Sequence, residues 1–355
     1  MLDKILNEMN LDALVITDAY NMRHVSGFRG GEGALYISRS QKVLITDSRY
    51  TEQAAKESSF TIAEEHREHK REQILKECME REGKAGAFHM GYEDESLLCI
   101  QFDKMKEALP VEVWTPLKGS INALRMVKTE EELKCLARAE EIGDQAFAKF
   151  LSLLKPGMTE LEAAAELEYL MKKEGAEDLS FNTIVASGLN SSMPHAIPSE
   201  KKFEVGEFIT FDFGCKYKGY CSDMTRTVVL GKANEKQKEI YSTVLKAQLA
   251  ALSALKAGVT GASVDKVARD IIAEAGYGDC FGHGLGHSVG LFIHEEPRLS
   301  PTDNTVLKAG MIETVEPGIY VPGFGGVRIE DMVIVTEDGH INLAHSPKEL
   351  IEIPV

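Results

Sequence analysis

In the stretch Gly282-His-Gly-Leu-Gly-His-Ser-Val-Gly-Leu-Phe-Ile-His-Glu295, three histidines stand among glycines and apolar residues. Two further stretches, Thr314-Val-Glu-Pro-Gly318 and Gly326-Val-Arg-Ile-Glu330, each add a glutamate in similar surroundings. Histidines and carboxylates that cluster away from a charged surface face are typical of a metal site. The carboxyl-terminal part of the chain therefore predicts half of such a site, and the chain before it must supply the other half.

Composition limits the classes of protein to consider. A chain of 355 residues exceeds what one hydrophobic core usually serves, so we expect two domains. With 43% hydrophobic and 27% charged residues and no apolar run near the ~20 residues of a spanning helix, no membrane segment is expected. The amino terminus does not resemble a signal peptide and the six cysteines form no C-x-x-C pair, which predicts a cytoplasmic location with reduced thiols. The net charge of -16 argues against nucleic acid or an anionic membrane as partner.

The first part of the chain alternates short apolar runs with helical segments. Residues 14–17, 34–38 and 43–46 are expected to form strands, and residues 72–82 and 96–109 helices, which is typical of an α/β domain. A stretch rich in Pro, Gly and Ser then breaks this pattern. We therefore expect domains at 1–122 and 123–355.

Helices and strand-rich stretches share the second part. Thr129 and Thr159 are each followed three residues later by a glutamate, the pattern of a capping box, so each predicts the start of a helix. Two more helices are expected near 235–256 and 263–275. Every candidate ligand falls in the stretches between and after these helices.

The missing half of the metal site is expected in a β-hairpin. Asp212 stands in the alternating strand Phe208-Ile-Thr-Phe-Asp-Phe-Gly214, where an unpaired buried carboxylate would cost several kcal/mol. Asp223 follows eleven residues later, and Gly214 and Gly219 are placed to allow a turn between the two aspartates. Carboxylates side by side repel each other unless a cation lies between them.

Together with Glu316, Glu330 and one histidine, the two aspartates give four carboxylates and one imidazole. Five side chains are too many for one tetrahedral zinc, but they suit two divalent cations ~3.5–4 Å apart. Manganese, cobalt or iron fits such an oxygen-rich set at least as well as zinc. The segment His294-Glu-Glu-Pro-Arg298 is no zincin motif, because it lacks the second histidine and Pro297 would break the helix.

The pattern as a whole resembles a family. Asp212, Asp223, His287, Glu316 and Glu330, in the contexts D-F-G, S-D-M-T-R-T, G-H-x-x-G-H, T-V-E-P-G-I-Y and G-G-V-R-I-E-D, are similar to the ligands of the pita-bread dinuclear metallopeptidases, family M24. Residues 25–33 and 45–50 are similar to the creatinase-like first domain of the Xaa-Pro peptidases, prolidase and aminopeptidase P. The resemblance implies an α/β (α+β) fold class, with a creatinase-like amino-terminal domain and a pita-bread catalytic domain.

The same resemblance implies the ligand roles. Asp212 would bind one metal, Asp223 and Glu330 would bridge both, and His287 with Glu316 would complete the other. Manganese is the favoured metal, with cobalt, zinc and iron left open. The metals would supply a hydroxide nucleophile, and Glu316 would also carry a proton to the leaving amine.

Substrate contacts are likewise implied by resemblance. His195 and His294 match histidines that contact the substrate and stabilise the tetrahedral intermediate, and His283 matches one placed near the position after the scissile bond. Arg328 and Tyr320 match positions that orient a ligand carboxylate. The family resemblance also suggests a homodimer.

The activity implied is hydrolysis of the amino-terminal Xaa-Pro bond of peptides with proline at the second position. Proline makes the preceding amide tertiary and conformationally restricted, so a dedicated pocket is needed. An Xaa-Pro dipeptidase is favoured, with an aminopeptidase P acting on longer peptides as the alternative. A creatinase-type amidinohydrolase and a non-catalytic peptide-binding module are more remote, since all five ligands are present.

Two positions depart from the family pattern. Phe292 stands where a polar or acidic residue is common, and Glu313 stands where an aliphatic one is common. If both lie on neighbouring strands, they could be exchanged partners that alter the shape of the pocket. Strand alternation places Glu313 on the face opposite Thr314 and Glu316, so Glu313 is not expected to bind metal.

Overall fold

The chain consists of two units in the computed structural model, which describes residues 2–84 and 87–355. The first unit is Met1–Arg125 and the second is Met126–Val355. Each unit has hydrophobic clusters of its own.

The amino-terminal unit is built on a six-stranded sheet in the order β4-β3-β2-β1-β5-β6. Its strands are β1 (Ala13–Ile16), β2 (Ala34–Ser38), β3 (Lys42–Asp47), β4 (Thr61–Glu65), β5 (His89–Tyr92) and β6 (Val113–Pro116). Its helices are α1 (Leu2–Glu8), α2 (Ala19–Ser26), α3 (Thr51–Glu57), α4 (Arg71–Arg81) and α5 (Cys99–Ala108). One hydrophobic cluster joins α1, α2 and α3 to the sheet, and another joins α4 and α5 to it.

These elements confirm the α/β prediction for the first part of the chain. The three predicted strands lie at Ala13–Ile16, Ala34–Ser38 and Lys42–Asp47, and the first predicted helix is α4. The second predicted helix, α5, begins three residues later than expected, because residues 94–96 form a turn.

Four long helices frame the carboxyl-terminal unit. They are α6 (Glu130–Leu151), α7 (Glu160–Lys173), α8 (Glu235–Ala254) and α9 (Gly261–Glu274). Both predicted capping boxes are formed: Glu132 and Glu162 each accept a hydrogen bond from the backbone N–H of the threonine three residues before, at 2.7 and 2.8 Å. Satisfying the free N–H groups in this way fixes where both helices begin.

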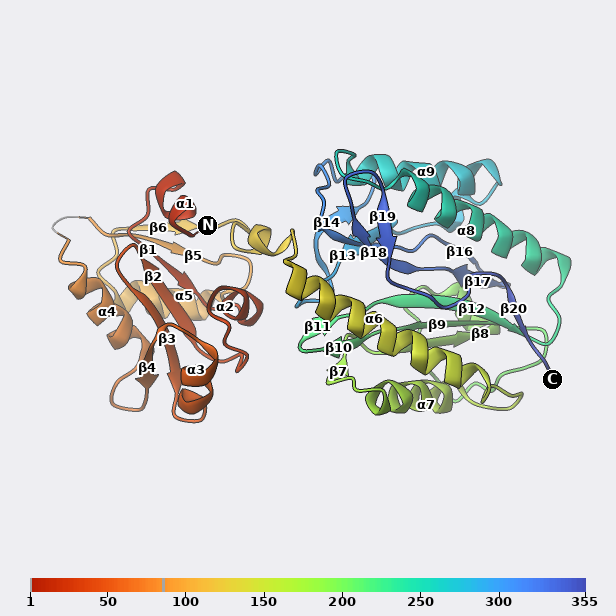
Figure 1. Cartoon of the computed structure of the whole chain (residues 1–355), viewed down its shortest axis with the longest axis horizontal. Coiled ribbons are helices and arrows are strands. Elements are labelled where there is room, and N and C mark those ends of the chain that lie inside the picture. Colours follow the sequence, from red (N-terminus) through yellow and green to blue (C-terminus); the bar gives the residue numbers. More distant parts are fainter. Residues whose placement is uncertain (1, 85–86) are drawn as a thin grey trace. The chain divides into compact units, whose positions relative to one another are not determined.

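The strands of this unit lie between the two helix pairs (Figure 1). The central sheet has the order β20-β12-β9-β8, and shorter ladders join β15-β18-β19, β16-β17, β13-β14 and β11-β10-β7. The strand bounds are β7 (Asp178–Leu179), β8 (Ile184–Ser187), β9 (Phe208–Phe213), β10 (Cys215–Tyr217), β11 (Tyr220–Cys221), β12 (Met224–Leu230), β13 (Gly286–Ser288), β14 (Glu295–Leu299), β15 (Ile312–Val315), β16 (Gly318–Val321), β17 (Gly325–Arg328), β18 (Asp331–Val335), β19 (His340–Asn342) and β20 (Ile351–Ile353). One cluster packs α6 and α7 on β8, β9 and β12, and another packs α8 and α9 on the ladders of β15 to β18. The strand layer is thus buried on both faces.

The predicted hairpin joins β9 to β12. The two strands pair antiparallel with Asp212 opposite Thr225, and Asp223 stands directly before β12. Lys218 and Gly219 make the tight turn, with φ of 47° and 75°, in the left-handed region that two-residue hairpin turns require. Gly214 has a different role: a Cβ there would lie 1.9 Å from the carbonyl oxygen of Ser222, so only glycine lets the two segments come this close.

Among the helices of the described residues, none is both long and apolar enough to span a membrane.

Candidate metal centre

The structure brings all five predicted ligands together. Asp212, Asp223 and Glu330 each offer a carboxylate oxygen within 4.8 Å of the others. His287 adds an imidazole whose Nε2 atom lies 3.5 Å from Asp223 Oδ2 and 3.5 Å from Glu316 Oε1. Four carboxylates and one imidazole therefore face a common space, as the sequence predicts.

Strand alternation explains how the acidic half of the cluster forms. Asp212 occupies the face of β9 opposite Phe211 and Phe213, which belong to the hydrophobic core. Thr225, directly across from Asp212 on β12, donates a hydrogen bond from Oγ1 to Glu330 Oε2 at 2.6 Å. The hairpin and the segment before β18 are thus tied together at the ligands themselves.

His287 and Glu316 are fixed by one threonine. Thr314 Oγ1 accepts the backbone N–H of His287 at 3.0 Å and donates to Glu316 Oε1 at 3.3 Å. The His287 Nδ1 atom lies 3.1 Å from the carbonyl oxygen of Ser288, which assigns the ring proton to Nδ1 and leaves the Nε2 lone pair toward the carboxylates. Gly286 permits this arrangement, since a Cβ there would lie 1.9 Å from the carbonyl oxygen of Thr314.

A cavity of about 530 Å³ opens onto these ligands. Nine of the ten predicted site residues line it: His195, Asp212, Asp223, His283, His287, His294, Glu316, Arg328 and Glu330. The cavity therefore combines the ligand cluster with three further histidines.

Tyr320 is the predicted site residue that does not line the cavity wall; it lies behind it. Its Oη atom accepts a hydrogen bond from Arg328 Nη1 at 2.7 Å and lies 2.9 Å from His283 Nε2. His283 Nδ1 lies 2.8 Å from the carbonyl oxygen of Gly284 and so carries the ring proton, which leaves Nε2 to accept from Tyr320. Tyr320 thus transmits the position of Arg328 to the His283 ring.

Arg328 is buried and spans the two sides of the cluster. It donates to Asp212 Oδ2 at 2.5 Å and to Thr225 Oγ1 at 3.1 Å. The other Asp212 oxygen, Oδ1, is buried without a hydrogen-bond partner in the described part of the chain. A buried carboxylate oxygen left in this way calls for a partner that the protein atoms do not supply.

Two family models match the chain. The model of metallopeptidase family M24 matches residues 134–337, and that of the creatinase/prolidase N-terminal domain matches residues 1–127. The chain belongs to metallopeptidase family M24. This confirms the resemblance drawn from the sequence, together with its creatinase-like first domain.

Several relatives of this M24 chain are similar over nearly their whole length. The Xaa-Pro dipeptidase of Pyrococcus furiosus is 40% identical, covering 98% of this chain and 97% of that protein. A solved Xaa-Pro dipeptidase from Bacillus anthracis superposes with a TM-score of 0.94 at 43% identity, covering 100% of this chain and 98% of the other. An X-Pro aminopeptidase from Thermotoga maritima superposes with a TM-score of 0.91 at 38% identity, covering 99% and 100%.

The donor set of this M24 protein fits divalent cations. Burial, reinforced by the neighbouring carboxylates, raises the pKa of Asp223 and of Glu330 well above the usual range, and burial raises that of Glu316 to about 8. Burial lowers the pKa of His287 to about 3, so its imidazole stays neutral, as a metal ligand must. A cation among these side chains would favour the charged carboxylates and use the free His287 lone pair.

Sequence reasoning missed several residues of the site. Thr225 and Thr314 hold the ligands, and Arg298 lines the cavity beside Ser300. The period of two along β12 could have identified Thr225, because it shares a face with Asp223. The sequence around Arg298 gives no sign of a site residue, because the segment that ends there is no zincin motif.

The two departures from the family pattern have separate places in this M24 chain. Phe292 lies in the loop between β13 and β14, so the condition for an exchange between neighbouring strands is not met. Its ring meets that of His294 edge to face, with centroids 6.2 Å apart. Glu313 is fully buried on β15 and lies outside the cavity wall.

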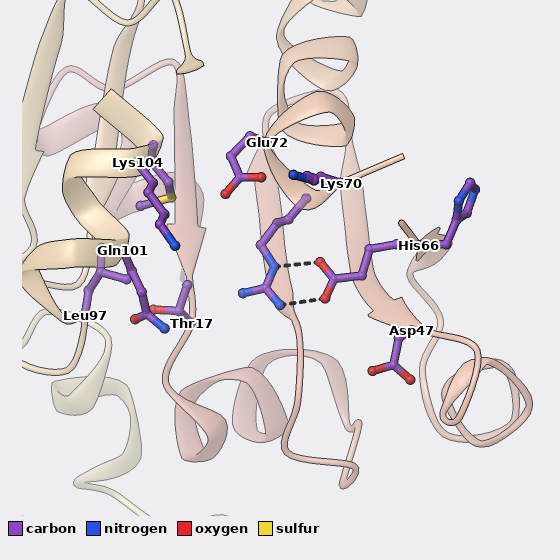
Figure 2. A pocket seen from close by; sticks show the side chains of 11 residues that line it. Thr17, Asp47, His66, Lys70, Glu72, Leu97, Gln101 and Lys104 are labelled. Carbon is purple, nitrogen blue, oxygen red and sulfur yellow. Dashed lines mark hydrogen bonds and ion pairs between the residues drawn. The ribbon is translucent and has the colours of Figure 1, made fainter. Parts of the chain in front are cut away.

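A second pocket, of about 410 Å³, lies in the amino-terminal unit at the carboxyl ends of β1, β3 and β4 (Figure 2). Arg71 and Glu65 form a two-bonded ion pair in it, each bond 3.0 Å long. The pocket balances three cationic side chains against three carboxylates, and none of the polar side chains described along its wall is buried. We assign it no ligand.

Proposed function

We propose that this chain is a dinuclear metal-dependent Xaa-Pro dipeptidase. The observation that carries the proposal is the convergence of Asp212, Asp223, His287, Glu316 and Glu330 on one cavity. The activity named for the Pyrococcus furiosus and Bacillus anthracis relatives supports the choice of substrate.

The ligand assignments are part of the proposal. Asp212 would hold one cation, Asp223 and Glu330 would lie between two, and His287 with Glu316 would hold the second. When bound, two divalent cations, with manganese proposed and cobalt, zinc or iron as alternatives, lower the pKa of a water towards neutrality and polarise the scissile carbonyl.

The proposed proton carrier is Glu316. Burial raises the pKa of its carboxyl to about 8 in the metal-free protein, and a bound cation would lower that pKa again, so the role rests on the place of Glu316 in the cavity wall and on the family resemblance. Its carboxylate, held by Thr314, would deliver a proton to the proline nitrogen as the amide bond breaks. The position of Glu316 is thus set by the same threonine that holds His287.

Three histidines in the cavity wall are proposed to contact the substrate. His195 and His294 would donate hydrogen bonds to the oxyanion that develops on the scissile carbonyl. His283 would contact the substrate beyond the scissile bond, held in place by Arg328 through Tyr320.

Arg298 favours a dipeptide over a longer peptide. A dipeptide carries its free carboxylate on the proline, within the cavity, and a guanidinium in the wall is the cation best suited to bind it. A longer peptide presents a neutral amide at that place. The similarity to the Thermotoga maritima X-Pro aminopeptidase keeps aminopeptidase P as the second candidate.

Hydrolysis of Gly-Pro and Arg-Pro-Pro in the presence of manganese tests the assignment. A dipeptidase cleaves Gly-Pro and leaves the tripeptide intact, whereas cleavage of the tripeptide alone would establish aminopeptidase P. Arg298→Met should raise the KM for Gly-Pro by about 10-fold or more, as expected for a lost charge-assisted contact worth ~1.5–3 kcal/mol. An unchanged KM would remove Arg298 from substrate binding.

Two further proposals, a homodimer and a cytoplasmic location, rest on the family resemblance and on the sequence. Light scattering of the purified protein would give twice the mass of the chain for a dimer. A mass equal to that of one chain would reject the dimer.

A further inference from the structure

A lysine ammonium is buried beside the metal centre. Lys128, which precedes the first turn of α6, has a side chain only 2% exposed. Its Nζ atom donates to Ser288 Oγ at 2.9 Å and lies 3.4 Å from Glu295 Oε2, whose side chain is 3% exposed. Moving two charged groups out of water is unfavourable, so this pair contributes little to stability, and a role in specifying the local geometry is left to explain it.

The first contact of Lys128 leads to His287. Ser288 follows His287 in β13, and its carbonyl oxygen accepts the Nδ1 proton that orients the His287 ring. The ladder between β13 and β14 shifts register between His287 and Ser288, so backbone pairing is irregular at this ligand. The hydrogen bond from Lys128 to the Ser288 hydroxyl therefore fixes β13 at the point where its backbone pairing with β14 is irregular.

The second contact leads to His294. Glu295 begins β14, directly after His294, and its Oε1 atom accepts the backbone N–H of Phe292 at 3.2 Å. Gly290 leaves the space for this carboxylate, because a Cβ there would lie 2.5 Å from Glu295 Oε2. Glu295 therefore closes the loop that carries His294, whose ring meets that of His287 edge to face at 4.6 Å between centroids.

We propose that Lys128 is a positioning residue for the metal centre: by binding Ser288 and Glu295 together, it holds His287 and His294 at the orientation that the cavity requires. This inference rests on the proposed metal site. Lys128 itself does not line the cavity and would touch neither metal nor substrate.

The test is metal binding by Lys128→Met, measured by calorimetric titration of the metal-free protein and by the visible spectrum of bound cobalt(II). Loss of a partner that orients a ligand typically weakens metal affinity ~10–100-fold, so we expect a loss in that range at one of two sites and an altered cobalt spectrum. A purely structural lysine would lower the free energy of unfolding and leave both readouts unchanged.

Lys201 supplies a matched control. Its Nζ atom donates to Ser187 Oγ at 3.0 Å and to Glu207 Oε2 at 2.7 Å, the same Lys-Ser-Glu chemistry in the same unit, outside the cavity wall. Lys201→Met should leave metal affinity and the cobalt spectrum unchanged.

The outcomes separate this inference from the proposed function. If the unaltered protein binds no metal, the metal site itself is wrong. If the unaltered protein binds two metals and Lys128→Met binds them as Lys201→Met does, the positioning role is overturned. Should Lys128→Met fail to fold, Ser288→Ala decides, since it removes only the hydroxyl; a severalfold loss of affinity supports the role, and unchanged affinity rejects it.

Discussion

Two buried arginines on neighbouring strands each pair with an aspartate, and only one of these pairs faces the cavity. Arg226 on β12 donates to Asp331 at 2.8 Å and to carbonyl oxygens of Ser346, Thr225 and Glu330, and Asp331 also accepts from Gln248, Asn342 and Lys348. Arg328 on β17 binds Asp212, but leaves the Oδ1 atom of that aspartate without a hydrogen-bond partner in the described residues. The closed pair completes its own hydrogen bonding, whereas the open pair leaves an oxygen for something else.

The two pairs differ in whether their carboxylates stabilise the fold or remain available to bind a cation. Burial opposes ionisation of Asp331, yet Arg226 and Lys348 hold its pKa below the usual range. Glu330, the preceding residue, has its pKa raised well above that range by burial and by Glu316 and Asp212. Two consecutive acidic residues thus serve opposite purposes, because strand alternation sends them to opposite sides.

The largest loss of activity should come from removing Glu330, which belongs to the ligand cluster around the open Arg328–Asp212 pair. Glu330→Ala removes a proposed bridging ligand, so turnover and metal retention should be lost together, by more than the ~100-fold typical of losing an outer partner. Activity with Gly-Pro and metal content by elemental analysis are the two measurements. Asp223→Ala should behave in the same way, and turnover kept in either variant would show that the bridging roles are wrong.

Removing Asp331 from the closed Arg226–Asp331 pair should instead lower the free energy of unfolding. Asp331→Ala leaves the Arg226 guanidinium buried without its carboxylate, which typically costs ~3–5 kcal/mol of unfolding free energy. Denaturant unfolding of the metal-free protein measures that loss. The folded fraction of the variant should still bind metal with near-normal affinity, and a loss of metal binding without a loss of stability would reverse the roles of the two pairs.

The two pairs also show what the sequence could and could not predict. Asp212 could be predicted because an unpaired carboxylate in an alternating apolar strand is costly, and Asp223 because the hairpin brings it alongside; both patterns are local. The choice of His287 among three histidines came from the family resemblance. The resemblance also places Arg328 beside a ligand carboxylate, and the structure pairs it with Asp212. The pairing of Arg226 with Asp331 could not be predicted, because it depends on how β12 and β18 lie side by side. Lys128 shows the limit most clearly: its partner Ser288 is 160 residues away, and a lysine before a capping box gives no sign of being buried.

Removing and restoring the metal should change stability by a smaller amount, and only in proteins that keep the ligand cluster. A ligand that binds only the folded state stabilises it by about 2.7 kcal/mol at a free concentration 100 times its Kd. Adding manganese after chelation should therefore raise the unfolding midpoint of the unaltered protein and of Asp331→Ala, but not that of Glu330→Ala. Equal shifts in all three proteins would mean that manganese binds elsewhere.

Glu313 is a third kind of buried carboxylate, and replacing it should have the smallest effect on stability. It is fully buried, and neither carboxylate oxygen has a hydrogen-bond partner in the described chain. Burial raises its pKa well above 4.5, although Lys128 partly opposes this. The folded protein therefore holds a proton on Glu313 that the unfolded chain releases above about 4.5, and this contribution to stability is present below that pH and is lost as pH rises towards the folded pKa.

Glu313→Leu removes this titration at nearly constant volume. Relative to the unaltered protein, the variant should gain unfolding free energy as pH rises from about 5.5 to 7.5, by at most ~1.4 kcal/mol for each pH unit. Urea unfolding of both metal-free proteins at the two pH values gives the difference, in which the titration of the metal ligands cancels. If the difference in unfolding free energy does not change with pH, Glu313 is charged in the folded state. Its carboxylate would then be ionised, as that of Asp331 is, and would not be a buried neutral acid.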